Sequence, residues 1–86
     1  MIYNEADMIM RYLEAAMSHA VYERLEDGTY AGRIPICLGV VAFGKSLRAC
    51  KRNLRSALED WVLLGLQWGD PLPVINGDRF EQKAHS

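Results

Sequence analysis

The sequence predicts an α+β domain in which a small antiparallel sheet packs against one long helix. Three observations support this prediction: a turn signal at Asp27-Gly28 between two strand-like segments, a β-branched and aromatic run over 38–43, and an amphipathic segment over 47–68. The predicted order is helix, strand, strand, strand, helix, strand. Consecutive strands grouped beside a long helix are typical of α+β domains.

Size and composition indicate one globular domain. The chain has 86 residues, of which 50% are hydrophobic and 24% charged, with a net charge of −1. We expect a single domain over residues 1–78 and a polar tail over 79–86. A chain of this length buries only about 60% of its unfolded surface, which favours self-association. Cys37 and Cys50 lack the spacing of a metal knuckle, and we find no secretory or membrane segment, so we expect a cytoplasmic protein.

The first predicted element is a helix over about residues 5–18. Ile9, Tyr12, Leu13 and Ala16 follow the i, i+3, i+4, i+7 spacing of one helical face. Asn4 stands where a residue that caps the start of this helix is expected.

A β-hairpin is expected next, with Asp27-Gly28 as a two-residue turn. Pairing outward from this turn produces one apolar face and one solvent face. The apolar face holds the pairs Leu25–Tyr30 and Val21–Ile34, with Glu23 opposite Gly32, and the solvent face holds Tyr22–Arg33 and Glu26–Thr29. Glu23 is therefore the one residue of the hairpin that does not suit its predicted face.

The second half of the chain predicts a third strand over 38–43 and a long helix over 47–68. Ser46 caps this helix, and Gly69 ends it shortly before two prolines. Val74 and Ile75 are expected to form a short last strand. The buried stripe of the helix is expected to comprise Leu47, Cys50, Leu54, Ala57, Leu58, Trp61, Gly65 and Trp68.

The segment Gly39–Ser46 matches the phosphate-loop pattern G-x-x-x-x-G-K-[ST]. A phosphate loop must wrap its backbone N–H groups around phosphate oxygens. Val40, Val41 and Phe43 instead favour extended backbone. We therefore interpret the segment as a strand, a turn and a helix cap, and we expect no nucleotide or other cofactor.

Residues 22–72 contain a series of short motifs in a fixed order. It comprises Asp27-Gly28, Tyr30-Ala31, Ile34-Pro35, Gly39, Gly44-x-Ser46, Arg52-Asn53-Leu54-Arg55-Ser56-Ala57-Leu58-Glu59, and Gly69 followed by Pro71 and Pro73. In these features the chain resembles the HicB-like antitoxin family. The resemblance implies a partial ribonuclease-H-like sheet and a non-enzymatic protein that masks a small HicA-type RNA-cleaving toxin. Only ten residues follow Asn76, so we expect no DNA-binding module.

Charge is unevenly distributed and suggests two candidate surfaces. Residues 1–28 hold six acidic and two basic residues, a net charge of −4, whereas residues 45–55 hold five basic residues and no acidic one. HicA-type toxins are typically basic, so the candidate toxin contacts are Glu23, Glu26 and Asp27. Arg48, Lys51, Arg52 and Arg55 fall on one flank of the predicted long helix, and Lys45 immediately precedes the helix cap. They form either a solvated face or a site for RNA or another acidic ligand.

Two further interpretations concern catalysis and assembly. A metal-dependent nuclease needs several converging carboxylates. The candidates Glu23, Glu59 or Asp60, and Asp78 are too sparse, so we do not expect an enzyme. Leu63 and Leu66 lie off the main stripe of the long helix and are candidates for self-association into a homodimer or a larger homo-oligomer.

Overall fold

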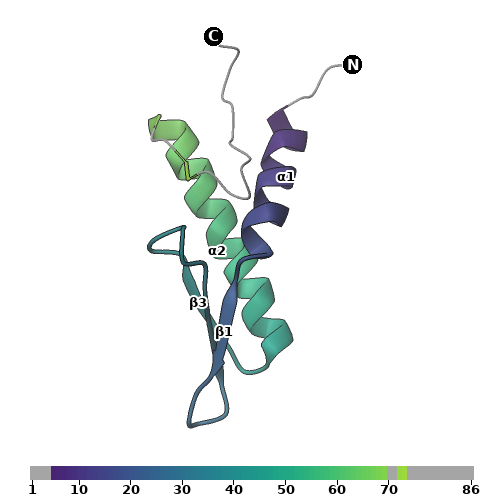
Figure 1. The fold of residues 1–86 in the computed structure, drawn as a ribbon, viewed down its shortest axis with the longest axis vertical. Coiled ribbons are helices and arrows are strands. Elements are labelled where there is room, and N and C mark those ends of the chain that lie inside the picture. Colours follow the sequence, from purple (N-terminus) through teal and green to yellow (C-terminus); the bar gives the residue numbers. More distant parts are fainter. Residues whose placement is uncertain (1–4, 70–71, 74–86) are drawn as a thin grey trace.

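The computed structural model describes residues 5–69 and 72–73 and has two layers (Figure 1). Its elements are α1 (Glu5–Met17), β1 (Val21–Arg24), β2 (Tyr30–Arg33), β3 (Val41–Gly44) and α2 (Leu47–Trp68). The strands form one antiparallel sheet in the order β1-β2-β3, α2 packs on this sheet, and α1 packs on α2. The predicted α+β class is confirmed. The expected cap Asn4, the expected last strand and the expected tail lie outside the described residues.

The first helix forms as its hydrophobic spacing predicts. Tyr12, Leu13 and Ala16 are buried, and Ile9 is partly buried against the same core. The phenol of Tyr12 donates a 2.6 Å hydrogen bond to the carbonyl oxygen of Pro73, 61 residues away. This bond joins α1 to the segment that follows α2.

The predicted register of the hairpin is wrong by one residue. The loop holds three residues, 26–28, because Leu25 and Thr29 are already paired through a 2.7 Å backbone hydrogen bond. Gly28 takes a left-handed conformation with φ of 90°, which closes a three-residue hairpin loop. Val21 therefore pairs with Arg33, and Glu23 pairs with Ala31.

This shift exchanges the two faces of β1, because side chains alternate along a strand. Tyr22, predicted to face solvent, lies opposite Gly32 and packs against the core. Val21 and Glu23, predicted to face the core, are exposed. Glu23 therefore does not lie on the apolar face.

The third strand is shorter than predicted and begins at Val41 rather than Leu38. Two successive turns precede it, with hydrogen bonds from Cys37 N to Ile34 O and from Val40 N to Cys37 O. They direct every third side chain inward, so Ile34, Cys37 and Val40 are buried while Leu38 is 82% exposed. The segment that matches the phosphate-loop pattern is thus a turn, a strand and a helix cap, as its β-branched residues predict.

The long helix has the predicted bounds. The hydroxyl of Ser46 accepts a hydrogen bond from Ala49 N, and Gly69 ends the helix in a left-handed conformation. The buried stripe follows a spacing of four residues: Cys50, Leu54, Leu58 and Val62. Leu47 and Trp68, predicted to be buried, are 40% and 73% exposed, because each lies at an end of α2. No helix in the described part of the chain is long and apolar enough to cross a membrane.

Close contact between β3 and α2 depends on Gly44. A Cβ atom at this position would lie 2.3 Å from the backbone nitrogen of Cys50. Gly32 also allows close contact, but the constraint is weaker than at Gly44. A Cβ atom there would meet side-chain atoms, namely the Tyr22 ring and the Cys50 sulfur, at 2.9–3.1 Å. Small residues on the sheet therefore let the first turns of α2 lie directly on it.

Candidate interaction surfaces

The β1–β2 hairpin carries the three acidic residues that the sequence proposes as toxin contacts. Glu23 is exposed on β1, and Glu26 and Asp27 are exposed in the loop. The carboxylate of Asp27 accepts hydrogen bonds from the backbone nitrogen of Thr29 at 2.9 Å and from its hydroxyl at 2.6 Å. These bonds hold the pKa of Asp27 below its usual range, so its charge persists at neutral and mildly acidic pH.

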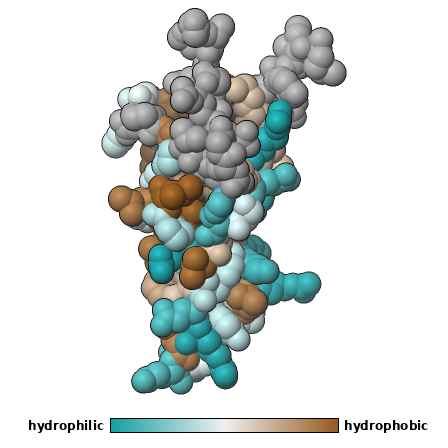
Figure 2. Space-filling model, viewed as in Figure 1, coloured by the Kyte–Doolittle hydropathy of each residue, from teal (hydrophilic) through white to brown (hydrophobic). Residues whose placement is uncertain are grey.

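The face of the sheet that points away from α2, here called the outer sheet face, is largely apolar. The residues that alternate onto it are Val21, Glu23, Ala31, Arg33, Val41 and Phe43. Val21, Val41 and Phe43 are 43%, 50% and 59% exposed. All but Phe43 line a shallow depression, and Figure 2 shows apolar patches between hydrophilic side chains at the level of the sheet.

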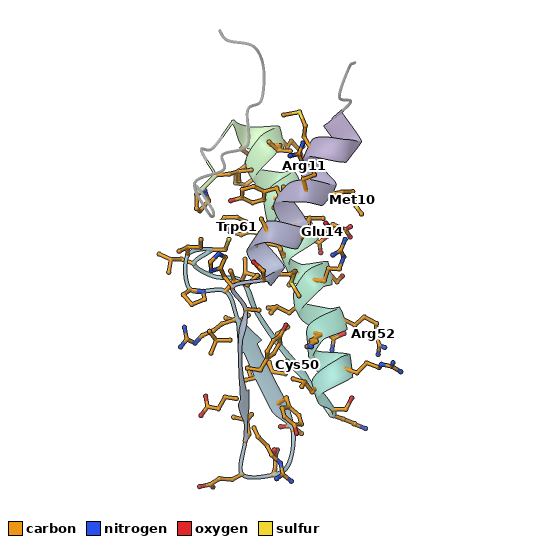
Figure 3. All side chains as sticks on the ribbon, turned by 45° about the vertical axis from the view of Figure 1, so that its right-hand side comes forward. Met10, Arg11, Glu14, Cys50, Arg52 and Trp61 are labelled. Atoms are coloured by element: carbon orange, nitrogen blue, oxygen red, sulfur yellow. The ribbon has the colours of Figure 1, made fainter. Side chains whose placement is uncertain are left out.

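The basic residues predicted on the long helix lie along one flank of its first half. Arg48, Lys51 and Arg52 are exposed there, and Lys45 is exposed in the turn before the helix. Figure 3 shows Arg52 pointing away from the sheet and Cys50 lying between α2 and the sheet. No acidic residue occupies the first turn of α2, although that position favours negative charge.

Two members of this basic flank contact other elements. The ammonium group of Lys51 lies 5.8 Å from the centre of the Tyr22 ring, a cation–π arrangement that links α2 to β1. Arg55 is half-buried, and its guanidinium lies 3.8 Å from the sulfur of Met10 on α1. Arg55 is therefore less available to a ligand than Arg48, Lys51 and Arg52, which are all exposed.

Comparison with known proteins assigns the family. The model of the UPF0150-like family matches residues 11–73, which contain the second half of α1, the whole sheet and α2. The chain belongs to the UPF0150-like family. A crystal structure of TTHA0281 from Thermus thermophilus is 45% identical to this chain, with a TM-score of 0.84. The likeness covers 90% of this chain and 96% of that one. No functionally curated protein matches the chain.

Several motif positions of this UPF0150-like chain have structural roles. Gly28 closes the hairpin loop, Gly44 allows contact between β3 and α2, and Ser46 caps α2. Asn53, within the motif on α2, donates a 2.7 Å hydrogen bond from its side-chain nitrogen to the carbonyl oxygen of Phe43. These residues stabilise the hairpin turn, the start of α2 and the packing of α2 on the sheet.

The self-association candidates of α2 differ in exposure. Leu63 is 48% exposed, whereas Leu66 is partly buried and packs against the core. Leu66 therefore offers less apolar surface for self-association than Leu63. Leu64, which is not among the predicted candidates, is 52% exposed.

The remaining chemical groups are dispersed or buried. Within residues 5–69 and 72–73, no three His, Cys, Asp or Glu side chains come together in a way that could hold a metal ion. Glu23 lies on the sheet and Glu59 and Asp60 lie on α2, all exposed, while Asp78 is outside the described residues. Cys37 and Cys50 are free and fully buried, and burial raises the pKa of both thiols, which disfavours the reactive thiolate.

Proposed function

We propose that this UPF0150-like chain is a HicB-like antitoxin that binds and masks a small HicA-type RNA-cleaving toxin. The family-level support is the resemblance over residues 22–72, which lies inside the matched range 11–73. The observation that carries the proposal is the acidic tip of the hairpin, where Glu26 and Asp27 are exposed in the loop and Glu23 is exposed on β1, whereas the exposed Arg24 and Arg33 lie on the strands. A protein that cleaves RNA needs a basic surface for phosphates, and an acidic surface is complementary to it.

The proposed mechanism is steric masking. The acidic hairpin would cover the basic surface of the toxin and thereby exclude RNA. Charge would accelerate the encounter, while a few apolar side chains at the contact would provide most of the affinity. No residue of this chain needs to perform chemistry in that mechanism.

The test is co-expression with a small basic HicA-type protein encoded beside the gene. Wild-type protein should relieve toxin-induced growth arrest and co-purify with the toxin at a fixed ratio. Glu26→Lys should weaken both effects, because it puts a positive charge on an exposed position of the hairpin loop. Asp60→Lys is the matched control, since it makes the same charge change at an exposed position of α2.

Two results would contradict the proposal. One is growth arrest that the wild-type protein does not relieve. The other is a stoichiometric complex that Glu26→Lys and Asp60→Lys weaken equally. That result would show that the hairpin is not the toxin-binding surface.

A second candidate function rests on the exposed basic flank of α2. There the chain would bind RNA through Lys45, Arg48, Lys51 and Arg52. Four phosphate contacts with single-stranded RNA predict a salt slope of about −2.8, or about a 50-fold loss of affinity between about 50 and 200 mM salt. Fluorescence anisotropy with a short labelled RNA measures this slope. Absence of binding at about 50 mM salt would exclude the candidate.

A further inference from the structure

The outer sheet face is built from two rows of residues that cross the three strands. The hydrogen-bonded register places Val21, Arg33 and Val41 in one row and Glu23, Ala31 and Phe43 in the next. Each row thus holds apolar residues and one charged residue. The two charges are opposite, so the face has no net charge, but one row is positive and the other is negative.

This arrangement is complementary to itself. We propose that the outer sheet face binds a second copy of this chain, face to face, around a two-fold axis that crosses the strands between the two rows. The interaction goes beyond the proposed function, because it needs neither toxin nor RNA. In a two-fold contact, residue i of one copy meets residue j of the other and the reverse.

The two-fold axis places unlike rows against each other. Phe43 of each copy lies over Val41 of the other, so the two most exposed apolar residues of the face cover one another. Glu23 lies on a strand adjacent to that of Arg33, about 4.8 Å to the side, so Glu23 of one copy lies beside Arg33 of the other. An axis parallel to the strands would instead place Arg33 over Arg33, and like charges in direct opposition are unfavourable.

The charge pattern favours a second copy over a basic toxin on this face. A basic partner would gain from Glu23 but would meet Arg33 in the middle of the sheet. The acidic pair Glu26 and Asp27 lies in the hairpin loop beyond both rows. A face-to-face pair therefore takes Glu23 out of the proposed toxin contact and leaves Glu26 and Asp27 available to another protein.

Hydrogen bonding at β3 also favours the face over the edge. Leu25 and Thr29 form a hydrogen-bonded pair, so Ala31, two residues on, directs its backbone groups toward β1. Phe43 is paired with Ala31 on the other side and hence directs its carbonyl toward the free edge of β3. That carbonyl already accepts the Asn53 hydrogen bond, which occupies a group that strand-to-strand pairing would use.

The test is a charge-exchange mixing experiment on the purified chain. Glu23→Arg and Arg33→Glu each create like charges across the contact, and each variant alone should raise the dimer dissociation constant at least about tenfold. An equimolar mixture of the two variants should form a heterodimer with affinity near that of the wild-type dimer. If each substitution acted only within its own copy, mixing the two variants would not restore dimer formation. Native mass spectrometry and light scattering measure the species, and circular dichroism confirms that each variant is folded.

A matched pair of apolar variants tests the same surface without charge. Phe43→Ser should abolish the dimer, whereas Leu63→Ser, at a similarly exposed position on α2, should leave it intact. A monomeric wild-type protein at about 0.5 mM, a mixture that yields no heterodimer, or a dimer lost only in Leu63→Ser would overturn the proposal. Because toxin is absent from this experiment, its outcome is independent of the Glu26→Lys co-expression test.

Discussion

Replacing Gly44 by alanine should separate β3 from α2. The added Cβ atom would lie 2.3 Å from Cys50 N, 2.7 Å from Cys50 Cα and 2.8 Å from the carbonyl carbon of Ala49. Ordinary contacts start at 3.4 Å, so the first turn of α2 must move by about 1 Å. All three atoms belong to the backbone and cannot rotate away. We therefore expect the upper end of the overpacking cost, about 3 kcal/mol.

That cost is a large share of the stability of a small domain, which totals about 5–15 kcal/mol. It corresponds to a fall in Tm of about 12–24 °C. Urea unfolding followed by circular dichroism measures the free energy directly. Gly65→Ala is the control, since its Cβ atom would meet only the flexible Leu72 side chain at 3.1 Å and alanine favours the helix. A loss below about 1 kcal/mol for Gly44→Ala would refute the packing argument.

Two further predictions concern single hydrogen bonds. Ser46→Ala removes the hydroxyl that accepts the 3.1 Å hydrogen bond from Ala49 N, and should lower the free energy of unfolding in urea by about 1 kcal/mol. Ser46→Asp should retain the cap. Equal losses in the two variants would contradict the capping role. Tyr12→Phe should flatten the alkaline stability profile. Burial raises the pKa of the Tyr12 phenol above its ordinary value of 10.0. The neutral Tyr12 phenol therefore stabilises the fold fully below about pH 10 and progressively less as pH rises further. Thermal unfolding across pH measures this effect. Parallel pH profiles of wild type and Tyr12→Phe would show that ionisation of Tyr12 does not affect stability.

The sequence predicts the long helix well because both of its ends have local signals. Ser46 and Gly69 act within one turn of the chain, so their effect does not depend on the rest of the fold. The exposure of Trp68 is different, because it depends on how far the sheet and α1 extend along α2. Helical spacing indicates a face but does not indicate where the neighbouring elements end.

The hairpin register shows a second limit. Asp27-Gly28 suits a two-residue turn, but it also suits the last two positions of a three-residue loop in which glycine adopts positive φ. The sequence does contain a signal that distinguishes the two. A shift of one residue moves Glu23 to solvent and Tyr22 to the core, which removes the misplaced acid of the two-residue register.

The same error concealed the outer sheet face. The two-residue turn places Val21 and Glu23 on the core face and Arg33 on the opposite face, so the residues that share the outer sheet face could not be recognised as one set. The acidic and basic clusters were accessible to sequence reasoning, because charge density can be counted along the chain. Their positions on a hairpin and on one helix flank needed only local structure.

The three-residue hairpin loop can lose a residue without exchanging the faces of β1. Surface loops normally tolerate changes in length. Without Glu26, Asp27-Gly28 would form a two-residue turn between the same flanking pair, Leu25 and Thr29, so Tyr22 would stay on the core face and Glu23 on the outer sheet face. Loss of a residue within β1 would instead move Tyr22 to the outer sheet face, so relatives of this chain should vary in loop length more readily than in the length of β1.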